Sequence, residues 1–171
     1  MRALAADEKK TMVMVYTHNM LARGEMITKE NARVSIWLRT QGVSNFIHLF
    51  NSQVISFGGP APRSLAFSEL FVPTAQVIGF HLVPPAQEPL DYDAEEANRL
   101  LKPMELIVGT FLLKGSIRVS TQAELATSLE VMHAAWTSVY DADISNPTLP
   151  QFNMHVPMLL VNPNQVSFGM A

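Results

Sequence analysis

The chain of 171 residues contains no cysteine. Disulfide bonds, cysteine nucleophiles and zinc–thiolate sites are therefore excluded, and we expect a cytoplasmic location, with which this composition is compatible. Charged residues are also scarce, at 16% of the chain. Since 48% of the residues are apolar, part of the apolar surface is expected to be covered by a partner, most simply another copy of the chain.

A run of basic residues and a long apolar segment are both missing. The 12 Lys and Arg residues are outnumbered by 15 Asp and Glu residues. Nucleic-acid-binding proteins need a positive surface that neutralises phosphates, so we expect no nucleic-acid partner. The sequence predicts no transmembrane segment, because no window approaches the ~20 apolar residues that a spanning helix needs. The first ten residues lack the apolar core of a signal peptide.

What the chain does contain is an internal repeat. A basic residue followed by glycine recurs 91 positions along the chain, and the match continues to the C-terminus with single-residue slips. We interpret this pattern as a tandem duplication; the alternative is two unrelated β-rich halves with similar patterning. The matched segments are Arg23-Gly24 with Lys114-Gly115, Phe46 with Trp136, Leu70-Phe71-Val72 with Leu159-Leu160-Val161, and Gln76-Val77 with Gln165-Val166.

Hydrophobic periodicity predicts similar elements in both halves. In the first half, a helix over 29–40 is expected to lie among extended segments at 11–28, 46–57, 66–72 and 76–82. In the second half, the extended segments are expected at 104–119, 139–144, 152–161 and 165–170. The second helix carries an apolar face formed by Leu125, Leu129, Met132 and Trp136.

Two further features concern the glycines and the connection between the halves. Gly24 is expected at a β-bulge or bend, because glycine inside a strand pattern marks such sites. Proline-rich residues 84–89 predict an extended linker. A short helix is then expected, capped by Asp93 and ended by Pro103.

These elements predict a mostly β, α+β protein made of two tandem small half-open β-barrel modules, each with one short helix. Its expected divisions are a flexible N-terminal arm (1–10), module 1 (11–83), the proline-rich linker and short helix (84–103), and module 2 (104–171). Short strands around one helix must curl or stack to bury a face. The modules are expected to pack through exposed strand edges or through the apolar faces of their helices.

One element order carries a resemblance to known families. Gly115-Ser116-Ile117 leads into a helix around Leu125 and Leu129, followed by the strand 139–144 and the closing segment Leu160-Val161-Asn162. This order resembles a family of small bacterial β-proteins described only as a domain of unknown function. It is also similar to Sm-like small barrels, a resemblance that implies pairing of edge strands into rings or filaments.

The chain departs from the Sm-like pattern in two respects. In Sm-like proteins the helix precedes the sheet, whereas here it interrupts the sheet. The basic RNA-contacting residues near the closing turn are missing, and Asn162 has Pro73 as its counterpart in the first half. These departures argue against RNA binding.

Titratable residues form no recognisable catalytic or metal-binding pattern. The histidines are His18, His48, His81, His133 and His155, and none adjoins an acidic residue in the sequence. Metal ligation and general acid–base catalysis need a second convergent group, so structural or solvent-exposed roles are expected. Asp141 and Asp143 alternate on one strand face, which favours a polar sheet surface. We predict no catalytic residue, no cofactor and no metal site.

The remaining candidates are two tryptophans and a set of methionines. Trp37 and Trp136 are expected to anchor the core, and stacking on a ligand is the alternative. Met154 and Met158 suit either core packing or an adaptable interaction surface. We expect a non-enzymatic structural or assembly protein that self-associates or docks as a subunit on a larger complex. The alternative is a small-molecule-binding or regulatory module with a pocket between the repeats, lined by these tryptophans. A third hypothesis is an enzyme whose groups converge only through the fold.

Overall fold

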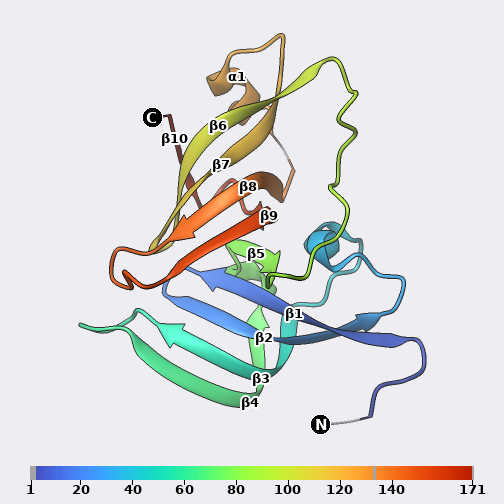
Figure 1. Cartoon of the computed structure of the whole chain (residues 1–171), viewed down its shortest axis with the longest axis vertical. Helices are drawn as coiled ribbons and strands as arrows, with labels where there is room; N and C mark the ends of the chain where they lie inside the picture. The colour runs from blue at the N-terminus through green and yellow to red at the C-terminus, as the bar shows by residue number, and fades with distance from the viewer. Residues whose placement is uncertain (1–2, 133, 171) are drawn as a thin grey trace.

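The computed structural model describes residues 3–132 and 134–170 and is dominated by ten β-strands (Figure 1). The first half contains β1 (Glu8–Thr17), β2 (Met20–Lys29), the 3-10 helix η1 (Val34–Arg39), β3 (Phe46–Ser56), β4 (Arg63–Pro73), the 3-10 helix η2 (Thr74–Gln76) and β5 (Gly79–Leu82). The second half contains β6 (Arg99–Val108), β7 (Phe111–Ser120), the helix α1 (Leu125–Glu130), β8 (Thr137–Ser145), β9 (Asn153–Val161) and β10 (Ser167–Gly169).

All ten strands belong to one open antiparallel sheet. Its order is β10-β6-β7-β8-β9-β5-β1-β2-β3-β4, so the strands of each half follow the same order and the halves meet where β5 pairs with β9. The expectation of a mostly β protein is confirmed. In place of two half-open barrels, however, the structure has one sheet that runs through both halves. The expected junction through strand edges is present, because Phe80 pairs with Leu160 across it.

The two halves also share their backbone irregularities. The pairing of β2 with β3 shifts register beside Gly24, and the pairing of β7 with β8 shifts beside Gly115. On the facing strands, Asn51 and Asp141 adopt positive φ angles of 48° and 51°. The predicted bulge at Gly24 is therefore confirmed. A Cβ atom added at Gly115 would lie 2.9 Å from the Tyr140 carbonyl oxygen, so this close approach requires glycine.

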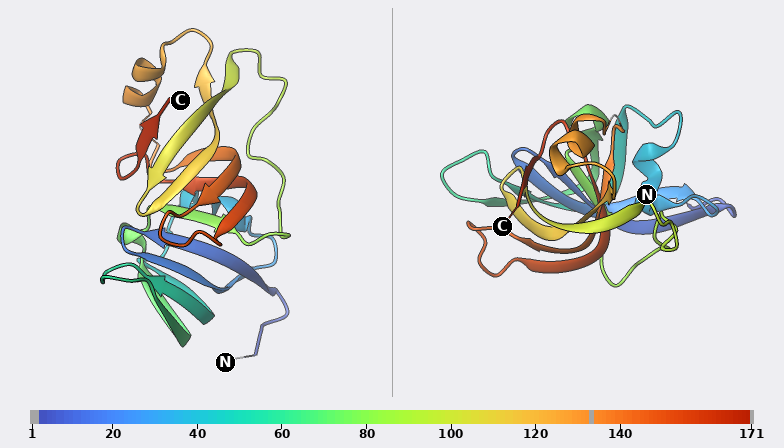
Figure 2. Two further views of the ribbon diagram at one scale, coloured as in Figure 1. Left: turned by 60° about the vertical axis from the view of Figure 1, so that its left-hand side comes forward. Right: turned by 90° about the horizontal axis from the view of Figure 1, so that it is seen from above.

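Two apolar cores lie on opposite faces of the central strand β1. Val13 and Val15 belong to the core of the first half, whereas Met14 and Tyr16 belong to the core of the second half. Successive strand side chains point to opposite faces, so each half covers one face of β1. The sheet twists strongly between the two halves, as the left view of Figure 2 shows. Both faces of β1 are apolar for this reason.

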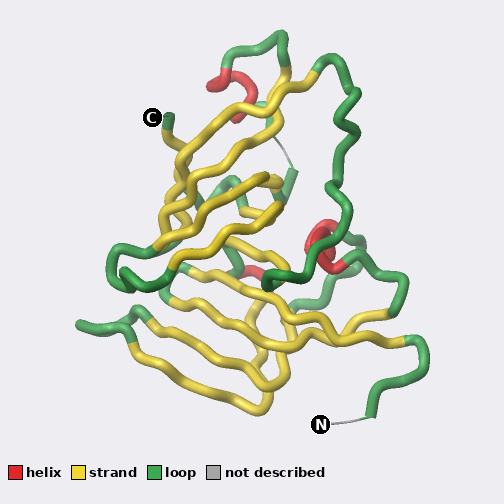
Figure 3. The backbone as a smooth tube through the Cα atoms, viewed as in Figure 1, coloured by secondary structure: helices red, strands yellow, loops and turns green. Residues whose placement is uncertain are grey.

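The connection between β5 and β6 runs as an irregular segment along one side of the molecule (Figure 3). The predicted helix between Asp93 and Pro103 is wrong. The Asp93 carboxylate accepts a hydrogen bond from the Glu95 N–H at 2.9 Å, which stabilises only a turn. The chain then enters β6 at Arg99, and Pro103 lies within this strand opposite Ser116. Residues from Arg99 onward therefore form a strand paired with β7 in place of the predicted helix.

Other boundaries also shift from their expected positions. The first predicted helix shortens to η1, and Trp136 lies just before β8 instead of continuing α1. β1 begins at Glu8, so residues 8–10 of the expected arm belong to the sheet. Within the described residues, none of the helices has the length and apolar character needed to cross a lipid bilayer.

Candidate functional site

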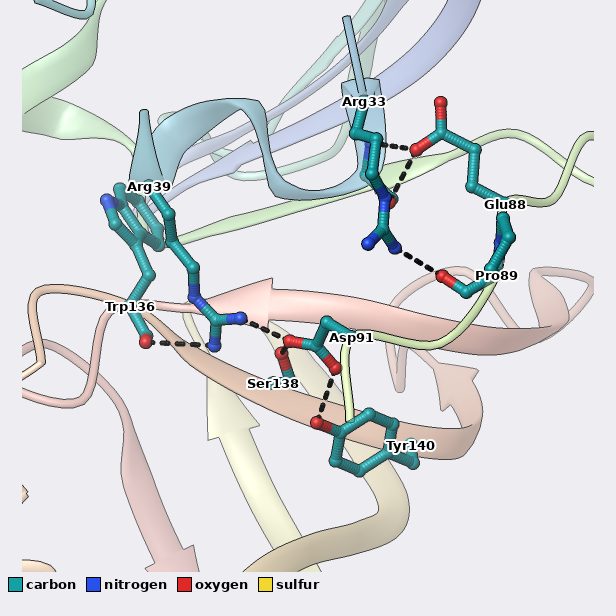
Figure 4. Close-up of polar contacts among 9 residues, drawn as sticks. Arg33, Arg39, Glu88, Pro89, Asp91, Trp136, Ser138 and Tyr140 are labelled. Atoms are coloured by element: carbon teal, nitrogen blue, oxygen red, sulfur yellow. Dashed lines mark hydrogen bonds and ion pairs between the residues drawn. The ribbon is translucent and has the colours of Figure 1, made fainter. Parts of the chain in front are cut away.

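Glu88 binds the linker, which connects β5 to β6, to the first half of the chain. Its carboxylate accepts hydrogen bonds from the backbone N–H groups of Val34 at 3.0 Å and Ser35 at 2.9 Å, and from the Ser35 hydroxyl at 2.6 Å. Figure 4 shows Glu88 on the linker, next to Arg33. Burial alone would raise the pKa of Glu88, but these hydrogen bonds bring the pKa below its usual range. The carboxylate therefore caps the first turn of η1, whose N–H groups have no partner within the helix.

Asp91 holds the linker against the second half. Its carboxylate accepts hydrogen bonds from the Ser138 hydroxyl and the Tyr140 hydroxyl, both at 2.6 Å, and it forms an ion pair with Arg39 of η1. The Arg39 guanidinium also donates a hydrogen bond to the Trp136 carbonyl oxygen at 3.2 Å (Figure 4). Asp91 and Arg39 thus connect the linker to both halves.

The environment of Asp91 perturbs two titrating groups. Burial would raise the pKa of Asp91, but the donors Ser138, Tyr140 and Arg39 bring the pKa below its usual range. The pKa of Tyr140 is raised, first by burial and then by its hydrogen bond to Asp91. Both shifts favour a carboxylate facing a neutral phenol. This cluster is suited to holding segments together, because every member already has a partner.

A pocket of about 460 Å³ lies beside this cluster. Residues of both halves line it, including Arg39, Arg99, Arg118 and Trp136. The Arg118 guanidinium lies 4.3 Å from the centroid of the Tyr92 ring, over its face, and 2.9 Å from the Glu96 carboxylate. Arg99 lies 3.9 Å from the same carboxylate. The pocket is basic, although acidic side chains of the linker compensate part of its charge.

A second polar pair is sealed inside the protein. The Tyr16 hydroxyl and His81 Nε2 are 2.8 Å apart, and His81 Nδ1 lies 2.7 Å from the Leu82 carbonyl oxygen. That carbonyl can only accept, so Nδ1 carries the hydrogen and Tyr16 donates to Nε2. Burial lowers the pKa of His81 to about 4 and raises the pKa of Tyr16. Both side chains are about 1% exposed, so no substrate can reach them.

Two surface histidines contact carboxylates across strands. His155 lies 2.8 Å from Asp143 and 3.1 Å from Asp141, and these contacts raise its pKa. His48 lies 2.9 Å from Glu69. Sequence reasoning missed these pairs because cross-strand neighbours are distant in the chain. Among residues 3–132 and 134–170, no three His, Cys, Asp or Glu side chains are arranged to hold a metal ion. His133 lies outside the described residues.

An exposed apolar surface lies on β3 and on β4, which is the last described strand at that end of the sheet and pairs with β3. On it, the His48 ring stacks on Phe71 and contacts Phe50, with both centroid distances at 4.1 Å. Phe46 and Phe71 are 48% and 55% exposed. Leu65 and Phe67 expose further apolar area along the same edge strand. We call the following residues the open face: Phe46, His48, Phe50, Glu69 and Phe71. Phe50 is its one buried member, at 7% exposure, and lies beneath the His48 ring.

The corresponding face of the second half is covered. Strand register pairs His48 with Phe71 and, in the second half, Ser138 with Leu160. The counterparts of the open face all have buried side chains, at 8% exposure or less. Linker residue Asp91 contacts Ser138 and Tyr140 of this surface, and the core of the first half includes Trp136 and Leu160. The counterparts are Trp136, Ser138, Tyr140, Met158 and Leu160.

The sequence-predicted tryptophans and methionines occupy different environments. Trp136 is buried in the core of the first half, and Trp37 is partly buried against the same core. Trp136 also lines the 460 Å³ pocket, whereas Trp37 is not among the described residues that line it. Met158 is buried on β9, and Met154 packs partly buried against the core of the second half. The structure therefore does not bring these four side chains together at one site.

Comparison with known proteins found no matching family model, no matching curated protein and no matching solved structure.

Proposed function

We propose that this protein is a non-enzymatic assembly subunit, which associates with copies of itself or docks on a larger complex through the open face. The observation that carries the proposal is the exposure of Phe46 on β3 and Phe71 on β4, at the end of the sheet. Native proteins blunt their sheet edges with charges, prolines or covering segments. β4 carries Arg63, Glu69 and Pro73 but also exposes Leu65, Phe67 and Phe71, which favours a surface that a partner covers.

The internal resemblance of the halves supports this proposal. The common strand order and the paired bulges are the features expected after a tandem duplication, which we propose as the origin of the chain. In the second half, the surface equivalent to the open face is buried by other parts of the chain. A surface of this type is therefore suited to burial against protein.

The proposal is tested by sedimentation velocity over a wide range of protein concentrations. We expect the unmodified chain to form species larger than a monomer, and Phe71→Lys to abolish them. Leu4→Lys is the matched control, because Leu4 is 41% exposed and lies outside the open face. A chain that stays monomeric at every concentration, and that captures no partner from cell extract through the open face, would overturn the proposal.

A second candidate function is binding of a small anionic molecule in the 460 Å³ pocket. Three arginines line this pocket, and the Ser128 hydroxyl beside them is buried without a hydrogen-bond partner among the described residues. Arginine suits recognition of carboxylates and phosphates. We expect such ligands to raise the melting temperature of the unmodified chain and to have less effect on Arg118→Gln. Equal shifts for both chains would exclude this pocket as the site.

A further inference from the structure

The junction between β5 and β9 shows how one half of this chain covers the other. Phe80 of β5 pairs with Leu160 of β9, and both are fully buried. Trp136 enters the same apolar core from the second half. From the first half, Val34 and Leu38 of η1 belong to this core and are also buried. The junction is therefore an apolar contact built around one pair of antiparallel strand edges.

Each side of this junction has a counterpart at a free end of the sheet. On the side of the second half, Trp136 and Leu160 correspond to Phe46 and Phe71 of the open face. On the side of the first half, η1 corresponds to α1, so that the counterparts of Val34 and Leu38 are Leu125 and Leu129.

Strand register identifies the counterpart of Phe80. Phe80 pairs with Val15 of β1, and Phe168 pairs with Leu106 of β6. Val15 and Leu106 occupy equivalent positions in the first strand of each half. Phe168 of β10 therefore corresponds to Phe80. Phe80 and Phe168 are 88 positions apart, whereas the matched pair Gln76-Val77 and Gln165-Val166 is 89 positions apart. The second half therefore has one residue fewer between its Gln-Val pair and this phenylalanine.

All five counterparts are incompletely buried. Phe46 and Phe71 are about half exposed at the β4 end of the sheet. At the β10 end, Leu125, Leu129 and Phe168 are only partly buried against the core of the second half. Among the described strands, β10 pairs with β6 alone, so its other edge is free. A groove of about 260 Å³ lies on the paired side of β10, lined also by residues of β6 and β7. The chain thus exposes both sides of a contact that it buries once internally.

We infer that a second copy of this chain seats β10 and α1 on the open face of the first copy. In this arrangement β10 pairs with β4 as β5 pairs with β9. Phe168 lies opposite Phe71, while Phe46 packs toward Leu125 and Leu129. The inference rests on the proposed assembly function and names its partner and register. The two surfaces differ, so the contact is head-to-tail and generates a filament or a closed ring.

A symmetric contact between two open faces is the main alternative for the same surface. Such a dimer would cover Phe46 and Phe71, but it would leave Phe168, Leu125 and Leu129 exposed at the other end. The head-to-tail contact covers both sets at once. It also continues the sheet with an antiparallel geometry that the chain already uses between its halves.

Two variants distinguish these arrangements. Phe71→Lys blocks the β4 end and Phe168→Lys blocks the β10 end, and both side chains are at least partly exposed, so the fold is expected to persist. Each variant alone is expected to be monomeric in sedimentation velocity. An equimolar mixture is expected to form a 1:1 dimer, because each variant retains one intact end. If Phe168→Lys assembles like the unmodified chain, the head-to-tail contact is wrong.

Cysteine cross-linking tests the register directly and does not depend on charge substitutions. The chain has no cysteine of its own, so any disulfide must join the introduced residues. Opposite residues of antiparallel strands have Cα separations that a disulfide can bridge. Phe71→Cys mixed with Phe168→Cys is expected to give a covalent heterodimer on mild oxidation. Cross-linking of Phe71→Cys only with itself would support the symmetric dimer and overturn the inference.

The two proposals fail in different ways. Self-association as a whole is contradicted if the unmodified chain remains monomeric and the mixture of Phe71→Cys and Phe168→Cys forms no cross-link. An unmodified chain that assembles, but whose assembly Phe168→Lys leaves unchanged, contradicts only the head-to-tail contact. Leu4→Lys serves as the control in sedimentation velocity and is expected to assemble like the unmodified chain.

Discussion

The buried pair of Tyr16 and His81 predicts a specific loss of stability in mild acid. In the folded protein, burial lowers the pKa of His81 from 6.5 to about 4. The unfolded chain therefore binds a proton near pH 6.5, while the folded chain resists protonation until about pH 4. The contribution of His81 is fully present above pH 6.5 and is lost as the pH falls toward 4.

The size of this loss follows from the shift in pKa. Each pKa unit corresponds to about 1.4 kcal/mol, so the free energy of unfolding should fall by roughly 2 kcal/mol between pH 8 and pH 5. The loss should reach roughly 3 kcal/mol by pH 4. The pKa of Asp91 is lowered, so protonation of its carboxylate weakens the fold only at still lower pH. His155 has a raised pKa and contributes with the opposite sign in the same pH range, so the comparison with His81→Gln isolates the contribution of His81.

Urea unfolding followed by tryptophan fluorescence measures this dependence. Dilute protein is needed, since association adds apparent stability. His81→Gln retains an acceptor for the Tyr16 hydroxyl but cannot be protonated, so its unfolding free energy should change less over the same range. Tyr16→Phe should lower stability by about 1 kcal/mol yet keep the pH dependence, because burial is the main cause of the shift. Equal pH dependence in the unmodified chain and His81→Gln would refute the reasoning.

Two further predictions concern the linker and the bulge. Asp91→Asn should lower the free energy of unfolding by about 2 kcal/mol in urea titrations, because a buried carboxylate loses its charge-assisted hydrogen bonds; Asp93→Asn, on the exposed turn, should have little effect. Gly115→Ala should lower the melting temperature and cost about 1–3 kcal/mol, because its Cβ would clash with backbone and side-chain atoms of β8. Gly58→Ala, where the nearest atom lies 3.9 Å from the added Cβ, is the control and should be nearly neutral.

Local patterns in the sequence predicted the strands better than the helices. The alternation of apolar residues between Phe46 and Phe57 placed β3 within one residue of its observed end. The apolar face from Leu125 to Trp136 predicted a longer helix than α1, which ends at Glu130. Trp136 is buried because the core of the first half receives its ring, and no local pattern carries that information.

Pairs of side chains across strands also escaped sequence reasoning. His155 is distant in sequence from Asp141 and Asp143, and only the pairing of β8 with β9 brings them together. Asp91 is a similar case, because its partners lie far away along the chain. The open face was also missed, since the sequence suggested Trp37, Trp136, Met154 and Met158 as interaction residues. The repeat matched Phe46 and Phe71 with Trp136 and Leu160, but only the structure shows that the first pair is exposed and the second pair is buried.

The β-rich character, the similar succession of elements in the two halves and the glycine at each bulge were predictable from the sequence, because they depend on local periodicity and backbone geometry. The order of the strands within the sheet was not predictable in this way. Only the tertiary structure decided that the halves share one sheet and that β1 is buried on both faces. It also decided which copy of the repeated surface is covered. Burial depends on which strand edges meet: β9 pairs with β5, whereas β4 and β10 each keep one edge without a partner among the described strands.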